Sequence, residues 1–156
     1  MVHAIDISPR LQTSGVPRRK GLYTMPTLAT LINMTMILAH QLAASSLTLE
    51  CSPLIAARPF FAHQIGDAAA TLLAQVADVQ LLSRQGYFSK LEALAVLSNA
   101  RKSGTELTAL LRSASVRGYV AEEETAPLIA LADETVACLL AVKMALRETA
   151  VRGRAA

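Results

Sequence analysis

Hydrophobic residues recur every three or four positions over four long stretches of this chain, a spacing typical of helices with one buried face. The first predicted helix runs from about Met25 to Leu49. Its predicted buried stripe is Leu28, Leu31, Thr35, Leu38, Leu42 and Leu49. Its opposite side carries Met34, Met36, Ile37 and Leu47. A helix apolar on two sides indicates either burial against a second subunit or a central place in a compact bundle.

Three further helices are predicted, after a connection from Glu50 to Pro59. They cover about Phe60–Ser83, Lys90–Arg117, and a last segment whose first turn carries the acidic run 122–124. This last helix begins with Thr125 as its N-cap or is kinked at Pro127. The predicted buried stripes are Ile65, Ala69, Leu72, Val76 and Val79 in the second helix; Ala93, Leu97, Ala100, Gly104, Leu107, Leu111 and Ala114 in the third; and Leu128, Leu131, Thr135, Leu139, Val142 and Leu146 in the fourth.

Glycines and one short motif predict where these helices end and how closely they pack. Gly86 is expected to end the second helix in a left-handed conformation, and Gly118 to end the third. Residues Ser89–Glu92 fit a capping box, which would start the third helix at Lys90. A glycine inside a helix costs about 1 kcal/mol relative to alanine, so Gly104 is expected to mark a close contact between helices.

Composition supports a single all-α domain. The chain has 156 residues, is 53% hydrophobic but only 4% aromatic, and shows no sustained strand alternation. Short connections between the later helices predict an antiparallel up-down four-helix bundle over residues 21–150. A flexible basic arm at 1–20 and a basic tail at 151–156 are expected to flank it.

The net charge of +3 is unevenly distributed, and one helix carries most of the bases of the body. Between residues 84 and 117 there are six basic residues and only two acidic ones. The candidate nucleic-acid- or partner-binding residues are Lys90, Arg101, Lys102, Arg112 and Arg117. These side chains either form a solvated helix face or meet RNA phosphates or an acidic partner. No aromatic residues are interleaved with them, so binding would depend on shape and charge.

Signatures of catalysis, metal binding and cofactor binding are absent from the sequence. No catalytic residue, metal or cofactor is therefore expected, and His40 and His63 are expected to have no acidic neighbour at ligand spacing. Cys51 and Cys138 are expected to be buried, small apolar residues. The uncharged run 21–49 after three basic residues resembles a membrane anchor, but its ten polar residues argue against a span. We expect a cytoplasmic protein.

Several short motifs resemble those of a known bacterial family. They are the Gln-x-x-x-Ala-Ala pattern at 64–69, Lys90-Leu91, Thr105-Glu106-Leu107, Leu110-Leu111-Arg112, Gly118-Tyr119-Val120 and Asp133-Glu134. The stretch from Phe61 to Glu148 is similar to the four-helix-bundle family that includes proteins of ribosomal-RNA intervening sequences and accessory variability determinants of diversity-generating retroelements. The resemblance implies a pentameric barrel, and for the retroelement branch a basic surface that binds reverse transcriptase and its RNA.

The leading hypothesis is therefore a non-enzymatic, oligomeric accessory scaffold for RNA and a reverse transcriptase. The alternative is a homo-oligomeric protein-interaction module with no nucleic-acid partner, which the net negative charge of residues 21–142 favours. A third hypothesis, a membrane-anchored helical protein, depends on residues 22–49.

Overall fold

A computed structural model describes residues 25–154, so the arm expected at 1–20 and the last two residues of the expected tail lie outside the described part. This part of the chain is all-α and contains no strand, which confirms the predicted class. The helices are α1 (Leu28–Glu50), α2 (Pro53–Ala56), α3 (Pro59–Leu82), α4 (Tyr87–Val116) and α5 (Glu122–Arg154).

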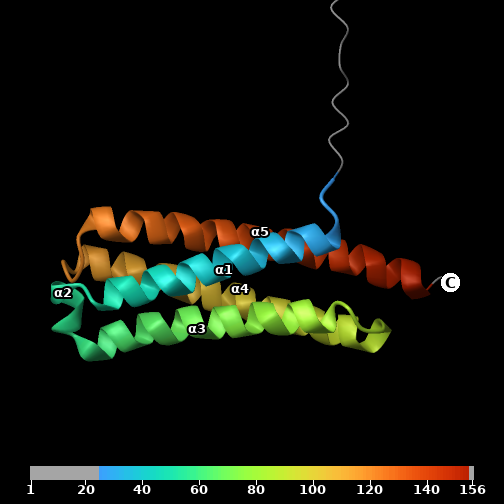
Figure 1. The fold of residues 1–156 in the computed structure, drawn as a ribbon, viewed down its shortest axis with the longest axis horizontal. Coiled ribbons are helices and arrows are strands. Elements are labelled where there is room, and N and C mark those ends of the chain that lie inside the picture. The colour runs from blue at the N-terminus through green and yellow to red at the C-terminus, as the bar shows by residue number, and fades with distance from the viewer. Residues whose placement is uncertain (1–24, 155–156) are drawn as a thin grey trace, which may run out of the picture.

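The four long helices lie side by side along one axis, and the short α2 lies at one end (Figure 1). Helix α1 packs against α3, α3 against α4, α4 against α5, and α5 against α1. In the described part, α1 and α4, and likewise α3 and α5, lie diagonally opposite each other across the bundle. The α2 end also holds the start of α3, the end of α4 and the start of α5 (Figure 1).

The core is a shared column of mostly Leu, Ala and Val side chains, and most of the predicted stripes form it. Every residue of the stripes predicted for α3 and α4 is buried. In α1 the stripe differs: Leu28 and Leu38 are half-buried, whereas Ile32, Ala39 and Ser46 are buried. The predicted stripe had no apolar residue at position 45. In the structure the buried residue of this turn is Ser46, because the buried side of the helix follows 3.6 residues per turn.

The predicted capping box at the start of α4 is wrong. Helix α4 begins at Tyr87, with Gly86 as an N-cap in extended conformation (φ −69°). The Ser89 hydroxyl lies inside the first turn and bonds the Gln85 side chain at 3.0 Å. Gly86 is therefore not left-handed, and its carbonyl accepts the first intrahelical bond of α4, from the Lys90 N–H at 3.2 Å.

Helix α5 starts three residues before the predicted N-cap. It begins at Glu122, and the Glu124 carboxylate accepts a hydrogen bond from the Ala121 N–H at 3.4 Å. Thr125 is a buried residue of the first turns, so the alternative in which it is the N-cap is wrong. Pro127 lies inside the helix, where its missing N–H leaves the carbonyl of exposed residue 123 to solvent. The helix continues to Arg154 and includes most of the predicted basic tail.

The end of α4 follows the prediction. Gly118 has φ +68°, a left-handed conformation that glycine adopts without a Cβ penalty. The Tyr119 N–H donates to the Ala114 carbonyl at 2.9 Å, and the Gly118 N–H to the Ser115 carbonyl at 3.0 Å. This pair of bonds is a Schellman motif, and it turns the chain toward α5.

The close contact expected at Gly104 is also present. Gly104 is buried where α4 packs on α5. A Cβ added at this position would lie 2.6 Å from Cγ2 of Val136. The absence of a side chain at residue 104 therefore lets the two helices approach each other.

Candidate functional site

Four of the five predicted binding residues lie on α4 and Arg117 is its C-cap, and the five do not share one face. Lys90, Arg101 and Arg112 are spaced by eleven residues, about three helical turns, so they form one line along the helix. Lys102 and Arg117 point to other sides of it. The line of three runs along the flank that meets α5, where Arg112 lies 3.6 Å from Asp133.

Neighbouring carboxylates offset part of this positive charge. Lys102 lies 3.8 Å from Glu106 on the same helix, and Arg112 pairs with Asp133 of α5. Arg101 is half-buried, and its Nε is buried without a hydrogen-bond partner. Residues 25–154 contain 11 basic and 11 acidic residues, so the described body is neutral and the surplus of +3 lies in residues 1–24. These charges do not make a concentrated basic face.

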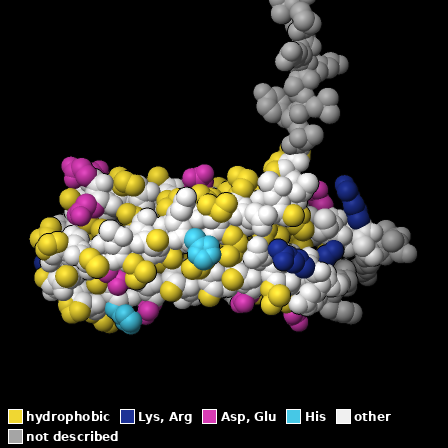
Figure 2. Space-filling model, viewed as in Figure 1, with side chains coloured by type: hydrophobic (Ala, Val, Ile, Leu, Met, Phe, Trp, Pro, Cys, Tyr) yellow, Lys and Arg dark blue, Asp and Glu magenta, His cyan; other side chains and the backbone are white. Residues whose placement is uncertain are grey.

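An apolar groove runs between α1 and α3, with a volume of about 410 Å³. Its lining consists of Met36, His40, Ala43 and Leu47 from α1, and Gly66, Ala70, Leu73, Ala74 and Ala77 from α3. Figure 2 shows hydrophobic side chains spread over this face of the molecule with a histidine among them, whereas Lys and Arg gather at one end. The Gly and Ala residues of α3 have short side chains and form the bottom of the groove. Small residues of this kind occur at surfaces where helices approach each other closely.

Large apolar side chains surround the groove. Ile37 and Leu47 of α1 are 58% and 62% exposed, and Leu81 of α3 is 61% exposed. The prediction that the first helix is apolar on a second side is confirmed, and in the described chain this side is open. Helix α1 has no charged residue before Glu50, and α3 has only two, Asp67 and Asp78.

Glu50 lies at the end of the groove with one carboxylate oxygen unsatisfied. Its Oε1 is buried and has no hydrogen-bond partner in the described part of the chain. A Cβ at residue 66 would overlap this oxygen, so Gly66 provides the space for the carboxylate against α3. A buried acceptor without a donor is costly, and a partner that brought a donor to this position would remove that cost.

A second cluster lies at the α2 end and combines two guanidinium groups with aromatic rings. The Arg58 guanidinium stacks on the Tyr119 ring with its Cζ 4.0 Å from the centroid, and its Nη1 donates to the Leu54 carbonyl at 3.1 Å. The Phe61 and Tyr119 rings meet edge to face at 5.5 Å. Together with Arg117 these groups line an open cavity of about 520 Å³.

The two guanidinium groups change the acidity of the phenol between them. A hydrogen bond from Arg117 lowers the pKa of Tyr119 most strongly. Its charge and the nearby Arg58 act in the same direction, against a desolvation that raises the pKa. Of the predicted binding residues, only Arg117 belongs to this cluster.

Sequence reasoning missed this cluster because it treated each end of a helix separately. The run Arg58-Pro59-Phe60-Phe61 starts α3, and Arg117-Gly118-Tyr119 ends α4. An up-down pair of helices brings the start of one beside the end of the next, so the predicted topology already implied that these runs meet. The signal was present, but it joins the ends of two helices, whereas aromatic residues were sought only between the bases of one helix.

The cysteines and one histidine depart from expectation. Cys51 is exposed at the end of α1, so its predicted burial is wrong, and Cys138 is half-buried. Desolvation, and then the nearby Glu134 carboxylate, raise the pKa of the Cys138 thiol. His63 does have an acidic neighbour, because its Nε2 lies 3.2 Å from Asp67 on the exposed surface. No cluster of three or more potential metal ligands occurs among the described residues.

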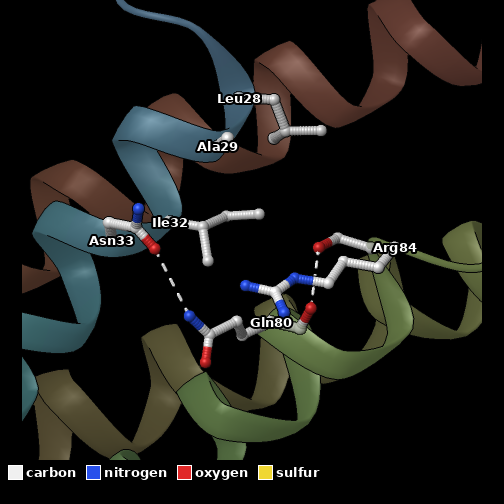
Figure 3. A pocket seen from close by; sticks show the side chains of 7 residues that line it. Leu28, Ala29, Ile32, Asn33, Gln80 and Arg84 are labelled. Atoms are coloured by element: carbon white, nitrogen blue, oxygen red, sulfur yellow. Dashed lines mark hydrogen bonds between the residues drawn. The ribbon is translucent and has the colours of Figure 1, made fainter.

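A small crevice of about 140 Å³ lies where the start of α1 meets the end of α3. Figure 3 shows Leu28 and Ile32 on one side of it, and Gln80 and Arg84 on the other. The Gln80 side-chain amide donates to the Asn33 side chain at 3.3 Å across the gap. Because this bond joins two of its polar groups, we regard the crevice as a seam between the helices.

Two helices, α1 and α3, are long and apolar enough to cross a bilayer by length and composition alone. Core helices of water-soluble proteins pass the same test. Only 22% of the apolar stretch of α1 and 28% of that of α3 are buried inside the molecule. Much of their apolar surface is therefore open in the single chain.

Comparison with known proteins gives no match, whether to family models, to curated proteins or to solved structures. The resemblance to the ribosomal-RNA intervening-sequence and retroelement family therefore stays a prediction.

Proposed function

We propose that this protein is a non-enzymatic, homo-oligomeric interaction module, built as an antiparallel up-down four-helix bundle whose copies join through the face formed by α1 and α3. The observation that carries this proposal is the apolar groove between these helices, with exposed Ile37 and Leu47 beside it. This module was the alternative in the sequence analysis. The neutral charge of the described body favours it over the RNA scaffold.

The dimensions of this face suit a contact between protein subunits. A helix of 23 residues such as α1 is about 35 Å long, and two adjacent helices present a width of about 20 Å. The face therefore offers about 700 Å², close to the ~800 Å² per partner of a stable protein interface. The bulky residues of one copy and the Ala and Gly floor of the other are complementary in size, as a self-associating face requires.

A second copy fits this face better than a bilayer does. Asp67 and Asp78 are exposed on α3, and Asn33 and Gln41 are exposed on α1. Charged side chains on a lipid-facing surface are costly, whereas at the rim of a protein interface they keep contact with water. We place the assembled protein in the cytoplasm.

The experiment is to measure molar mass by light scattering while placing a charge in the groove. Ala70→Glu would bury an unpaired carboxylate in the interface, a cost of about 3 kcal/mol or more, which raises the dissociation constant at least ~100-fold. The control is Ala109→Glu, the same substitution at an exposed position of α4. We expect an oligomer for wild type and control, and a smaller species for Ala70→Glu. A wild type that is monomeric at high concentration would refute the proposal.

A second candidate is the RNA- and reverse-transcriptase-binding accessory scaffold, as a pentamer, that the family resemblance implies. One observation favours it: Lys90, Arg101 and Arg117 have no carboxylate within ion-pair distance in the described chain. Lys90, Arg101 and Arg117 would contact phosphates directly. Lys102 and Arg112 would join them once phosphate replaces Glu106 and Asp133 as their ion-pair partners.

Salt dependence tests this second candidate. Phosphate contacts release counterions, so affinity for structured RNA would fall steeply between low and physiological salt. In the double variant Lys90→Ala with Arg101→Ala, the logarithm of the affinity should fall less steeply with the logarithm of the salt concentration. The change in slope should match the loss of about two phosphate contacts. Ala109→Glu would be a poor control because it adds charge, so Thr105→Ala, at an exposed and uncharged position of α4, is used instead. Absence of RNA binding at low salt rejects this candidate.

A further inference from the structure

We infer that the cavity lined by Arg58, Phe60, Arg117 and Tyr119 binds a nucleotide, with its phosphate on the two guanidinium groups and its base against the exposed phenylalanine. The ligand class is a phosphate ester that carries a planar ring. It could come from a free mononucleotide or from the phosphorylated end of a single-stranded RNA. The inference does not depend on self-association, because no residue of this cavity lines the groove between α1 and α3.

The cationic part of this cavity is preorganised. Arg58 is held in place by its stack on Tyr119 and by its bond to the Leu54 carbonyl. That bond uses one of the five N–H donors of a guanidinium group, so others stay available to phosphate oxygens. Arg117 approaches the same phenol from the end of α4. Two guanidinium groups converging from different helices match the oxygens of a phosphate, which bind Arg in a fork geometry.

Competing carboxylates are absent from the lining. The other residues there are Pro59, Phe61 and Gln64, and none is acidic. Within residues 25–154, neither Arg58 nor Arg117 forms an ion pair with a carboxylate, unlike Lys102 and Arg112. Two converging cations without a counterion repel each other, and an incoming dianion would relieve that repulsion.

The ring-binding part of the cavity is Phe60. Its side chain is 76% exposed although Phe61, the next residue, packs against the core. An exposed aromatic ring beside cationic groups is the arrangement on which bases stack in proteins that bind single-stranded nucleic acids. Gln64 lies one turn further along α3 and offers an amide for the edge of a base.

The test is calorimetric titration of the full chain with adenosine monophosphate, with inorganic phosphate, and with a short single-stranded RNA carrying or lacking a 5′ phosphate. We expect adenosine monophosphate to bind at least about tenfold more tightly than inorganic phosphate, because stacking of the base adds to the ionic contacts. Phe60→Ala should remove that advantage and leave phosphate binding unchanged. An RNA that binds more tightly only with its 5′ phosphate would identify an RNA end as the source. If adenosine monophosphate binds as tightly as the RNA that carries a 5′ phosphate, the free nucleotide is the source.

Two variants separate this cavity from general charge attraction. Arg117→Ala should weaken adenosine monophosphate binding at least tenfold, and Arg58→Lys should weaken it too, because lysine keeps the charge but not the fork. The control, Lys102→Ala, removes an exposed base of α4 outside the cavity and should change nothing. The inference is overturned if adenosine monophosphate does not bind at millimolar concentration. Equal weakening by Lys102→Ala and Arg117→Ala would also overturn it.

Discussion

Replacing Gly104 by alanine tests whether the approach of α4 to α5 depends on the missing side chain. The new Cβ would lie 2.6 Å from Cγ2 of Val136, about 1 Å inside an ordinary carbon–carbon contact. A valine in a helix has one strongly preferred rotamer, so Val136 cannot turn away and the helices must shift. Such overpacking costs about 1–3 kcal/mol, while alanine returns about 1 kcal/mol of helix propensity. We expect a net loss of about 0–2 kcal/mol.

Urea unfolding followed by circular dichroism measures this difference, at one protein concentration so that any association contributes equally. The control is Gly153→Ala, where a Cβ would meet nothing within 4 Å and where the propensity gain is small because residue 153 lies in the last turn of α5. Glycine to alanine should therefore be up to about 2 kcal/mol less favourable at residue 104 than at residue 153. Val136→Ala should cost less in the Gly104→Ala background than in wild type. Equal stabilisation by both alanines would refute the reasoning.

Three further predictions concern single side chains. Ser46 is fully buried and its hydroxyl has no partner, so Ser46→Ala should raise the free energy of unfolding by about 1 kcal/mol, and a loss of stability in urea would contradict this. Arg117→Ala should raise the pKa of Tyr119, measured by tyrosinate absorbance during alkaline titration; an unchanged titration would show that the two groups do not interact. Because this pKa is lowered in the folded state, ionisation of Tyr119 favours folding only at alkaline pH and changes nothing near neutrality. Cys51, which is exposed, should react with iodoacetamide faster than Cys138, whose pKa is raised; the reverse order in peptide mapping would contradict the structure.

The buried faces of the later helices could be predicted because they depend on a local period. Ala69 and Leu72 in α3, and Leu107 and Leu111 in α4, are buried as the spacing of apolar residues indicated. In α1 the same rule was less reliable, because residues are apolar on both sides and the spacing does not show which side faces the core. The surface of that helix was predicted as apolar, but the sequence could not tell what covers it.

Helix ends and the candidate sites were harder to predict, for two different reasons. Gly86 suits both the end of one helix and the N-cap of the next, because glycine is common at both positions. At the start of α5 the N-cap is Ala121, which has no side-chain acceptor, and only the Glu124 carboxylate marks the position. The up-down topology implies that the start of α3 lies beside the end of α4, but the stacking of Arg58 on Tyr119 depends on the geometry of two turns, which the spacing of apolar residues does not give.

The order of the helices along the chain has a consequence for synthesis. The two apolar helices, α1 and α3, are made first, and the more highly charged helices α4 and α5 that cover their inner sides follow. Until Arg154 has left the ribosome, the α1–α3 pair exposes apolar surface on both its sides. At ordinary translation rates this interval lasts roughly 4–15 seconds, long enough for chaperones to bind. The apolar surface of α1 and α3, through which we propose that folded copies associate, thus also makes the chain prone to premature association during synthesis.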